Sequence, residues 1–303
     1  MKIIYGFVDK LIDVTEICFS KLRKENIITI PHNDIVRANI FTDPANHILK
    51  KIYIFDDNRI TEYDDSVIIE IDVSNNSVNT INKDVQLNNA FYTSKIIHTN
   101  LLIKYGTMND ELPEQLMAII YLTGKEKILE IGGNIGRNSL TIAHILKKQN
   151  NKNLVVLESD TDISNQLREN RDINHFDFHI ENSALSKRKL IQKDWITMES
   201  DVLLEGYKTI NTITLEQLNN KYNIVFDTLI LDCEGAFYFI LMDMPEILNN
   251  IKLIIMENDY TDISHKEYID TILKQNNFYV DFSLSGGWGP CFNNFFEVWK
   301  KNT

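Results

Sequence analysis

The chain has 303 residues, of which 44% are hydrophobic, so there is room for one full α/β domain and a smaller second one. Its formal net charge of −12 argues against binding to nucleic acid, because phosphate contacts need clustered lysine and arginine. The three cysteines lack metal-type spacing and are typical of reduced thiols. No signal-like or bilayer-spanning apolar run is found, so we expect a soluble, cytoplasmic protein with no membrane partner.

Residues 1–95 differ in character from the rest of the chain. Short alternating segments predict strands at 3–8, 26–30, 51–55 and 67–73, and one amphipathic helix is expected at 15–23. Residues 74–89 are rich in Asn and Ser and are interpreted as a connection. We therefore expect a small β-rich domain over 1–95, which could shape an acceptor pocket, bind a glycan or form the face of a homodimer.

The most informative stretch is residues 127–136, Lys-Ile-Leu-Glu-Ile-Gly-Gly-Asn-Ile-Gly. An apolar run breaks into a glycine-rich turn and a helical segment follows, as in α/β proteins that bind a nucleotide-like ligand at the carboxyl edge of a sheet. Gly132 and Gly136 permit the turn and a close approach of the backbone to a ligand. The dinucleotide fingerprint G-x-G-x-x-G does not fit. Glu130, two residues before the first glycine, suits a ligand with a cationic head, such as S-adenosylmethionine.

Further segments end in polar residues in the same way. The second strand, 153–158, ends in Glu158, which is placed to accept hydrogen bonds from two ribose hydroxyls. A third strand, 176–180, leads into Ser183 and Ala184, where an adenine ring could lie against small side chains. Because parallel strands end at one edge of a sheet, we expect five acids to converge there: Glu130, Glu158, Asp232, Glu234 and Glu257.

Such a cluster of acids is unfavourable unless a cation lies among them or a proton is shared. A sulfonium ligand or a bound divalent metal would meet that need. The alternative role for Asp232 and Glu234 is helix capping, since acids stabilise the start of the helix that follows them.

Residues from about 95 to 300 resemble the FkbM family of class I S-adenosylmethionine-dependent methyltransferases. The matching elements are Glu-Ile-Gly-Gly-Asn-Ile-Gly at 130–136, Val-Leu-Glu at 156–158, Asn-Ser-Ala-Leu-Ser at 182–186, Ile-Thr-Leu at 213–215, Leu-Asp-Cys-Glu-Gly at 231–235 and Phe-Phe-Glu-Val-Trp at 295–299. The resemblance implies a Rossmann-like α/β sheet flanked by helices over residues 96–303. Leu231 and Phe237 depart from the family, which often has Lys and usually has Glu at these two positions.

The resemblance also implies an activity. Members commonly methylate hydroxyl groups, often on sugars or polyketide-derived products, so the expected acceptor is a small molecule or glycan. Glu234 is the expected base, and Asp232 is expected to hold the methionine amino group, the acceptor or a metal. The implied cofactor-binding positions are Glu130, Gly132, Gly133, Asn134, Gly136, Glu158, Ser159, Ser183, Ala184 and Asp232.

A second resemblance concerns a metal. Metal-dependent sugar O-methyltransferases of macrolide and aminocoumarin pathways place acids at the ends of the fourth and fifth strands. Asp232, Glu257 and Asn258 occupy comparable places, and an oxygen set of this kind selects Mg²⁺, Ca²⁺ or Mn²⁺. Dependence on Mg²⁺ is therefore a hypothesis.

Two other functions stay open. Leu231 and Phe237 are compatible with a non-catalytic protein that binds a glycan or partner and carries an inactive methyltransferase domain. A nucleotide-linked oxidoreductase is disfavoured by the failed fingerprint. Three local predictions remain. Trp288, in a glycine-rich loop, either stacks on a sugar or fixes the loop to the core. Cys233 is expected to face the core, and residues 187–189 are expected to form a solvated basic loop.

Overall fold

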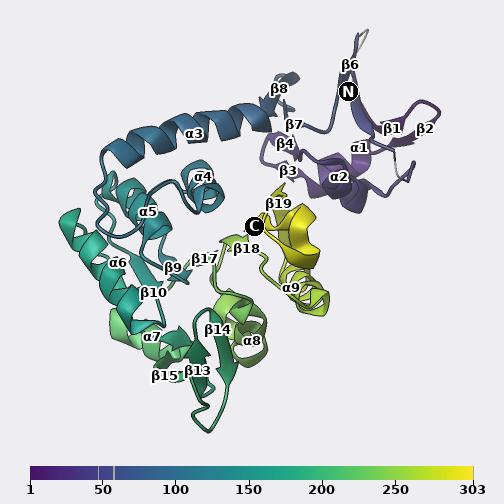
Figure 1. Ribbon diagram of the computed structural model, residues 1–303. Helices are drawn as coiled ribbons and strands as arrows, with labels where there is room; N and C mark the ends of the chain where they lie inside the picture. The colour runs from purple at the N-terminus through teal and green to yellow at the C-terminus, as the bar shows by residue number, and fades with distance from the viewer. Residues whose placement is uncertain (47, 57–58, 303) are drawn as a thin grey trace. The chain divides into compact units, whose positions relative to one another are not determined.

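The computed structural model describes residues 1–46, 48–56 and 59–302. These residues divide into two compact units, Met1–Ala90 and Phe91–Thr303, where the sequence suggested a boundary near residue 95. Helix α3 (Lys83–Thr99) runs across the boundary (Figure 1).

The first unit is built mainly from two antiparallel sheets of four strands each, in the orders β2-β1-β5-β6 and β3-β4-β7-β8. Its strands are β1 (Lys2–Phe7), β2 (Lys10–Asp13), β3 (Arg23–Lys24), β4 (Ile27–Ile30), β5 (Lys51–Asp56), β6 (Arg59–Tyr63), β7 (Val67–Asp72) and β8 (Ser77–Asn82), and its helices are α1 (Thr15–Lys21) and α2 (Asp34–Phe41). The expected connection over 74–89 is wrong in part, because β8 and the start of α3 lie within it.

Alternation along the strands explains the core of this unit. In β4 and β5 every second residue is buried, which gives each sheet one apolar face made largely of isoleucine. A buried cation completes the core: the guanidinium of Arg37, fully shielded from solvent, donates to the carbonyl oxygens of Pro31, Asp64 and Val67 at 2.7–2.8 Å. These three hydrogen bonds tie the chain at Pro31, Asp64 and Val67 to Arg37 in α2. Each acceptor is a backbone carbonyl oxygen rather than a carboxylate.

The second unit contains a sheet of seven strands in the order β11-β10-β9-β17-β18-β20-β19. These strands are β9 (Ile128–Ile131), β10 (Leu154–Leu157), β11 (His179–Glu181), β17 (Thr228–Leu231), β18 (Leu253–Glu257), β19 (Phe278–Leu284) and β20 (Phe296–Lys301). The first five run parallel, whereas β20 pairs antiparallel with both β18 and β19. Every residue of β9, β10 and β17 is buried, as expected for parallel strands covered on both faces.

Helices and a small added sheet surround these strands (Figure 1). The helices are α4 (Leu112–Tyr121), α5 (Arg137–Lys147), α6 (Thr161–Ile173), α7 (Leu215–Tyr222), α8 (Ala236–Asp243) and α9 (Ile263–Gln275), with 3₁₀ turns at Pro245–Leu248 and Gly289–Asn294. The short strands are β12 (Ala184–Leu185), which pairs with β16 (Thr212–Ile213), and β13 (Leu190–Lys193), which lies between β14 (Ile196–Glu199) and β15 (Lys208–Ile210).

The strand order places β9 beside both β10 and β17, so the chain reverses direction across the sheet at β9. Ligands of open α/β sheets bind at the carboxyl ends of the strands at such a reversal. The predicted fold class, a Rossmann-like α/β sheet flanked by helices with a smaller β-rich N-terminal part, is confirmed.

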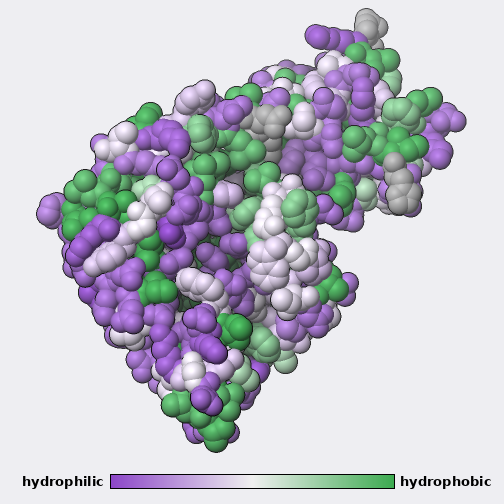
Figure 2. Space-filling view, viewed as in Figure 1, coloured by the Kyte–Doolittle hydropathy of each residue, from purple (hydrophilic) through white to green (hydrophobic). Residues whose placement is uncertain are grey.

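Hydrophilic and hydrophobic residues are interspersed over the face of the second unit that Figure 2 shows. One group of hydrophobic residues lies at the lower end of the view, where the β13–β14–β15 sheet lies, and Val202, Leu203 and Leu204 in the β14–β15 connection are exposed. Within the described ranges, no helix is both long enough and apolar enough to cross a membrane.

Candidate active site

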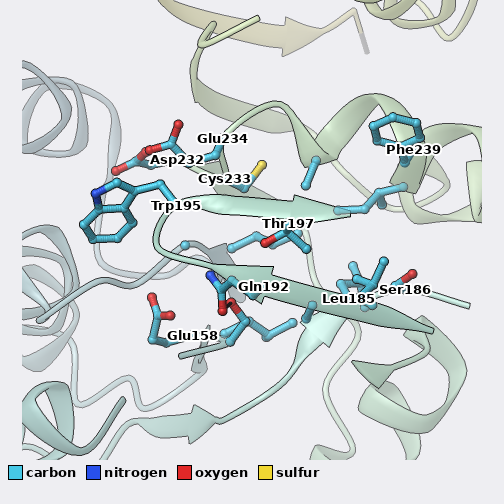
Figure 3. Close-up of a pocket in the computed structure, with 18 of the residues that line it drawn as sticks. Glu158, Leu185, Ser186, Gln192, Trp195, Thr197, Asp232, Cys233, Glu234 and Phe239 are labelled. Atoms are coloured by element: carbon cyan, nitrogen blue, oxygen red, sulfur yellow. Dashed lines mark hydrogen bonds between the residues drawn. The ribbon is translucent and has the colours of Figure 1, made fainter. Parts of the chain in front are cut away.

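A cleft of about 710 Å³ lies at the carboxyl ends of the parallel strands, and all of its lining residues belong to the second unit. This volume is in the range of small-molecule and cofactor sites. Figure 3 shows acids at one end of the cleft, where Glu158, Asp232 and Glu234 lie, and Leu185 and Phe239 at the other.

The glycine turn forms one wall of the cleft. The amides of Gly132 and Gly133 both donate to the carbonyl oxygen of Leu157 at 3.0 Å, which ties the end of β9 to the end of β10. Gly132 has φ +90°, and a Cβ at this position would lie 1.5 Å from the carbonyl oxygen of Asp232. Only glycine therefore allows β9 and β17 to end so close together.

The other two glycines of the motif pack rather than line the cleft. A Cβ on Gly133 would lie 2.2 Å from Val156 Cγ1, and one on Gly136 would lie 2.4 Å from Leu167 Cδ1. The structure brings Gly132 and Asn134 to the cleft lining, whereas Gly133 and Gly136 lie outside it.

Glu158 lies where the sequence predicts. Its two carboxylate oxygens accept backbone N–H groups of Asn134 at 2.9 Å and Asp160 at 2.8 Å, and its side chain lines the cleft beside Ser159. Each oxygen keeps lone pairs for a ligand, since a carboxylate offers about four acceptor sites. Burial raises the pKa of Glu158 to about 7, although these hydrogen bonds oppose the shift.

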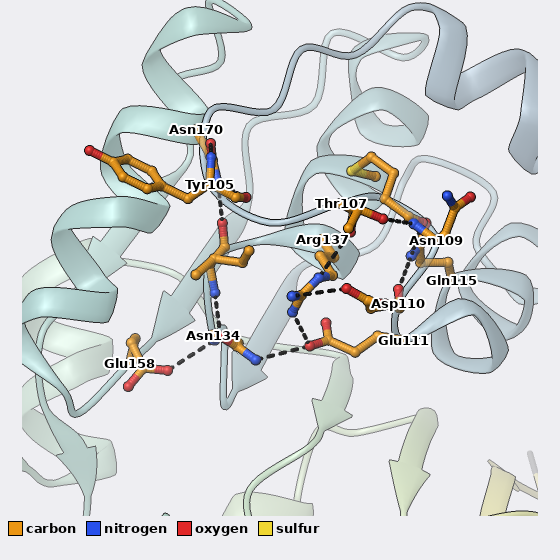
Figure 4. A network of polar contacts seen from close by, with 12 residues as sticks. Tyr105, Thr107, Asn109, Asp110, Glu111, Gln115, Asn134, Arg137, Glu158 and Asn170 are labelled. Carbon is orange, nitrogen blue, oxygen red and sulfur yellow. Dashed lines mark hydrogen bonds and ion pairs between the residues drawn. The ribbon is translucent and has the colours of Figure 1, made fainter. Parts of the chain in front are cut away.

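A polar network fixes the turn from the other side (Figure 4). Glu111 Oε1 accepts from Asn134 Nδ2 at 2.9 Å and from Arg137 Nη1 at 2.6 Å. Arg137 Nε also donates to the carbonyl oxygen of Thr107 at 3.0 Å. The segment before α4 is thereby bound to the glycine turn, and Glu111 lines the cleft. Sequence reasoning gave Glu111 no role.

Glu130 is not brought to the cleft. It is 2% exposed, and its Oε2 accepts a hydrogen bond from Ser139 Oγ in α5 at 2.6 Å. Burial raises its pKa to about 8. In β9 the next residue, Ile131, lines the cleft, so the alternation of the strand turns Glu130 away from it. The expectation that Glu130 touches a cationic ligand head is therefore not supported by this placement.

Three carboxyl groups meet at the acidic end of the cleft. Glu114 comes from α4, Asp232 follows β17 and Glu257 ends β18, and one oxygen of each lies within 4.8 Å of the others. Burial, followed by the neighbouring acids, raises the pKa of Asp232 well above its ordinary value and that of Glu257 to about 11. Burial also raises the pKa of Glu114.

Asn258, predicted as a metal ligand, lies elsewhere. It is fully buried outside the cleft lining, and its Nδ2 donates to the carbonyl oxygen of Asn294 at 2.6 Å and to Glu297 Oε2 at 3.1 Å. The Oδ1 atom of Asn258 is buried and has no hydrogen-bond partner. The structure brings Asp232 and Glu257 together as predicted, and it adds Glu114, which sequence reasoning missed.

The residues after Asp232 form a tight turn that faces the cleft. Glu234 is exposed, has φ +51° and lines the cleft, and partial burial raises its pKa. The amide of Gly235 donates to Asp259 Oδ1 at 2.8 Å, which fixes the turn at the start of α8. Cys233 also belongs to the cleft lining (Figure 3), and burial raises the pKa of its thiol well above the ordinary value.

The residues that were expected to contact an adenine ring lie in the cleft lining. Ser183, Ala184 and Leu185 line the cleft, and β12 is held there by pairing with β16. Across the cleft lie Ile240 and the exposed ring of Phe239 in α8.

A hairpin that the sequence reasoning missed covers this region. Gln192 and Trp195 line the cleft from β13 and its turn, and Thr197 and Met198 from β14. Trp195 is 56% exposed and lies at the hairpin tip beside the acids (Figure 3). Trp288, the aromatic residue chosen from the sequence, is not part of the lining.

The basic run 187–189 is only partly solvated. Arg188 lines the cleft and pairs with Asp243 through Nε–Oδ2 at 2.6 Å and Nη2–Oδ1 at 2.8 Å, and with Glu199 at 3.0 Å. This pairing fastens the hairpin to the end of α8.

No family model and no curated protein matches the chain. Solved structures to which it is similar include a ribosomal protein L11 methylase from Lactobacillus delbrueckii subsp. bulgaricus, with 12% identity, a TM-score of 0.40 and coverage of 66% of this chain and 82% of that one. They also include an O-methyltransferase from Bacillus cereus in complex with SAH, with 16% identity, a TM-score of 0.39 and coverage of 73% and 93%. A methyltransferase from Pyrococcus furiosus has 13% identity, a TM-score of 0.39 and coverage of 71% and 98%. At these values the similarities say nothing about substrate, and the account of the site rests on its own geometry.

Proposed function

We propose that the chain is an S-adenosylmethionine-dependent O-methyltransferase of the FkbM type that methylates a hydroxyl group of a sugar or glycan. The observation that carries this proposal is the meeting of the glycine turn, Glu158 and the turn at Asp232 and Glu234 in one cleft. The order of the motifs along the chain supports the FkbM assignment, and the sugar acceptor is taken from that resemblance.

The cleft fits the cofactor in three respects. Glu158 offers free lone pairs to a pair of vicinal hydroxyls. Ser183 and Ala184 leave room for a flat ring opposite α8. The carboxyl groups of Glu114, Asp232 and Glu257 give the cleft an acidic end that suits a positively charged ligand.

Bound S-adenosylmethionine would supply an electrophilic methyl group. The chain's own part is to align the acceptor oxygen with that group and to remove its proton. Glu234 is the proposed base, because it is exposed to the cleft and its raised pKa makes its carboxylate a better proton acceptor. Asp232, beside it, is proposed to hold the cofactor's amino group, the acceptor or a metal ion.

Trp195 and the acids together suit an amphipathic acceptor. The exposed indole offers an apolar face at the cleft, and the carboxylates of Glu158 and Glu234 offer hydrogen-bond acceptors nearby. A sugar ring presents both kinds of surface. For the first unit, acceptor recognition or dimerisation stays a proposal, and light scattering of the full chain tests the second.

The test is methyl transfer from labelled S-adenosylmethionine to a panel of glycans, small sugars, phenols and amines, followed by mass spectrometry of the products. We expect label on a sugar hydroxyl and a fall of at least about 10²-fold in kcat for Glu234→Gln with little change in cofactor binding. Cofactor binding without transfer to any acceptor would favour the non-catalytic alternative. Label on amines alone would contradict O-methylation.

A further inference from the structure

The acidic end of the cleft holds three carboxyl groups with no cationic side chain to balance them. One oxygen each of Glu114, Asp232 and Glu257 lies within 4.8 Å of the others. Within the described part of the chain, no lysine, arginine or histidine is found in an ion pair with any of the three, and other carboxylates are their main electrostatic neighbours. By contrast, Glu111 a short distance along the chain is paired with Arg137 at 2.6 Å.

A second observation points to a missing ligand. The Oε2 atom of Glu114 is buried and has no hydrogen-bond partner. Glu114 itself is 6% exposed and lines the cleft. Buried polar atoms in folded proteins nearly always have a partner, and an unpaired buried carboxylate oxygen is strongly unfavourable. Helix α4 contacts β18, which carries Glu257, so the fold holds this oxygen beside the other acids.

We propose that Glu114, Asp232 and Glu257 bind one divalent metal ion. This proposal deepens the proposed function and rests on it only for the role of the ion. An all-oxygen set of three carboxylates is the donor chemistry that hard cations prefer. Asn258, whose Nδ2 donates to Asn294 and Glu297, is fully buried and lies outside the cleft lining.

The chemistry of the candidate ions distinguishes them. Ca²⁺ accepts flexible sets of oxygen ligands, whereas Mg²⁺ demands near-octahedral geometry and gives up its water ligands reluctantly. Three carboxyl groups from separate elements of the fold, with one oxygen of each within 4.8 Å of the others, therefore suit Ca²⁺ or Mn²⁺ better than Mg²⁺. When bound, the ion would act as a Lewis acid toward an acceptor hydroxyl. Glu234 lies outside the set of three and stays free to take a proton.

Calorimetric titration of the full chain with CaCl₂, MnCl₂ and MgCl₂, without cofactor, tests the site directly. We expect one site with a Kd below about 1 mM for Ca²⁺ or Mn²⁺ and weaker binding of Mg²⁺. Glu114→Gln and Glu257→Gln should each lower the affinity at least tenfold, and the ion should no longer raise the melting temperature. Glu267→Gln, an exposed glutamate on α9, is the matched control and should bind as the parent chain does.

The variants remain informative about folding because each replaces a buried carboxyl group by an amide of nearly the same shape. Both should melt at or above the temperature of the metal-free parent chain. Failure of all three ions to bind would overturn the proposal, as would unchanged affinity in Glu114→Gln. The proposed function is tested separately, by titration with S-adenosylhomocysteine in EDTA, so either idea can fail while the other stands.

Discussion

Replacing Gly132 by alanine tests how closely the site depends on the meeting of β9 and β17. The added Cβ would lie 1.5 Å from the carbonyl oxygen of Asp232, whereas ordinary contacts begin at 3.4 Å, so the two strand ends must separate by about 2 Å. The left-handed φ of +90° adds about 1–2 kcal/mol of strain. Because the contact is with backbone, no side-chain rotation relieves it, and we expect a total loss of at least about 3 kcal/mol.

Gly206→Ala is the matched control. Gly206 has φ +78°, but its nearest neighbour is the end of the Lys193 side chain at 3.5 Å, so this variant carries only the strain of about 1–2 kcal/mol. Urea unfolding followed by tryptophan fluorescence reports the second unit, since Trp195, Trp288 and Trp299 all lie there. Equal losses of unfolding free energy in the two variants would refute the reasoning, as would S-adenosylhomocysteine binding to Gly132→Ala with the affinity of the parent chain.

Two further predictions concern buried charge and the hairpin. The pKa of Glu130 lies near 8 in the folded protein, whereas its ordinary value is 4.5, so the folded state binds the proton more tightly than the unfolded state does. The free energy of unfolding therefore falls as the pH rises from about 4.5 to 8. In Glu130→Gln, where Ser139 can still donate to the amide oxygen, urea unfolding between pH 5 and 9 should show a smaller fall, and an unchanged slope would contradict this account. Trp195→Phe should abolish the change in fluorescence caused by S-adenosylhomocysteine, while Trp288→Phe should retain it; the reverse result would place the ligand at the other loop.

The fold could be predicted because its signals are local. Parallel strands covered on both faces give continuous apolar runs, and β9, β10 and β17 carry such runs. Each is followed by a polar residue or glycine at the sheet edge, so the glycine turn, Glu158 and Asp232 could be assigned to one cleft before any contact was known.

The parts of the site that escaped prediction depend on contacts distant in sequence. Glu114 reaches the cleft only because α4 packs near β18, more than 130 residues later in the chain. Side chains alternate along β9, and which face of the sheet Glu130 occupies depends on how the strand meets the turn at Gly132. No local sequence pattern reveals that face. The hairpin of β13 and β14 is short, and β14 is exposed throughout, so the burial signal that marks a strand is nearly absent.

The central claim is that the cleft binds S-adenosylmethionine with Glu158 on the ribose hydroxyls. Calorimetric titration of the full chain with S-adenosylmethionine tests it most directly, with Glu158→Gln as the variant and the exposed Asp162→Asn as its control. The account predicts one site of micromolar affinity, weakened by at least about tenfold in Glu158→Gln because hydrogen bonds to a charged acceptor are lost, and unchanged in Asp162→Asn. Absence of binding, or equal affinity in all three proteins, would contradict it.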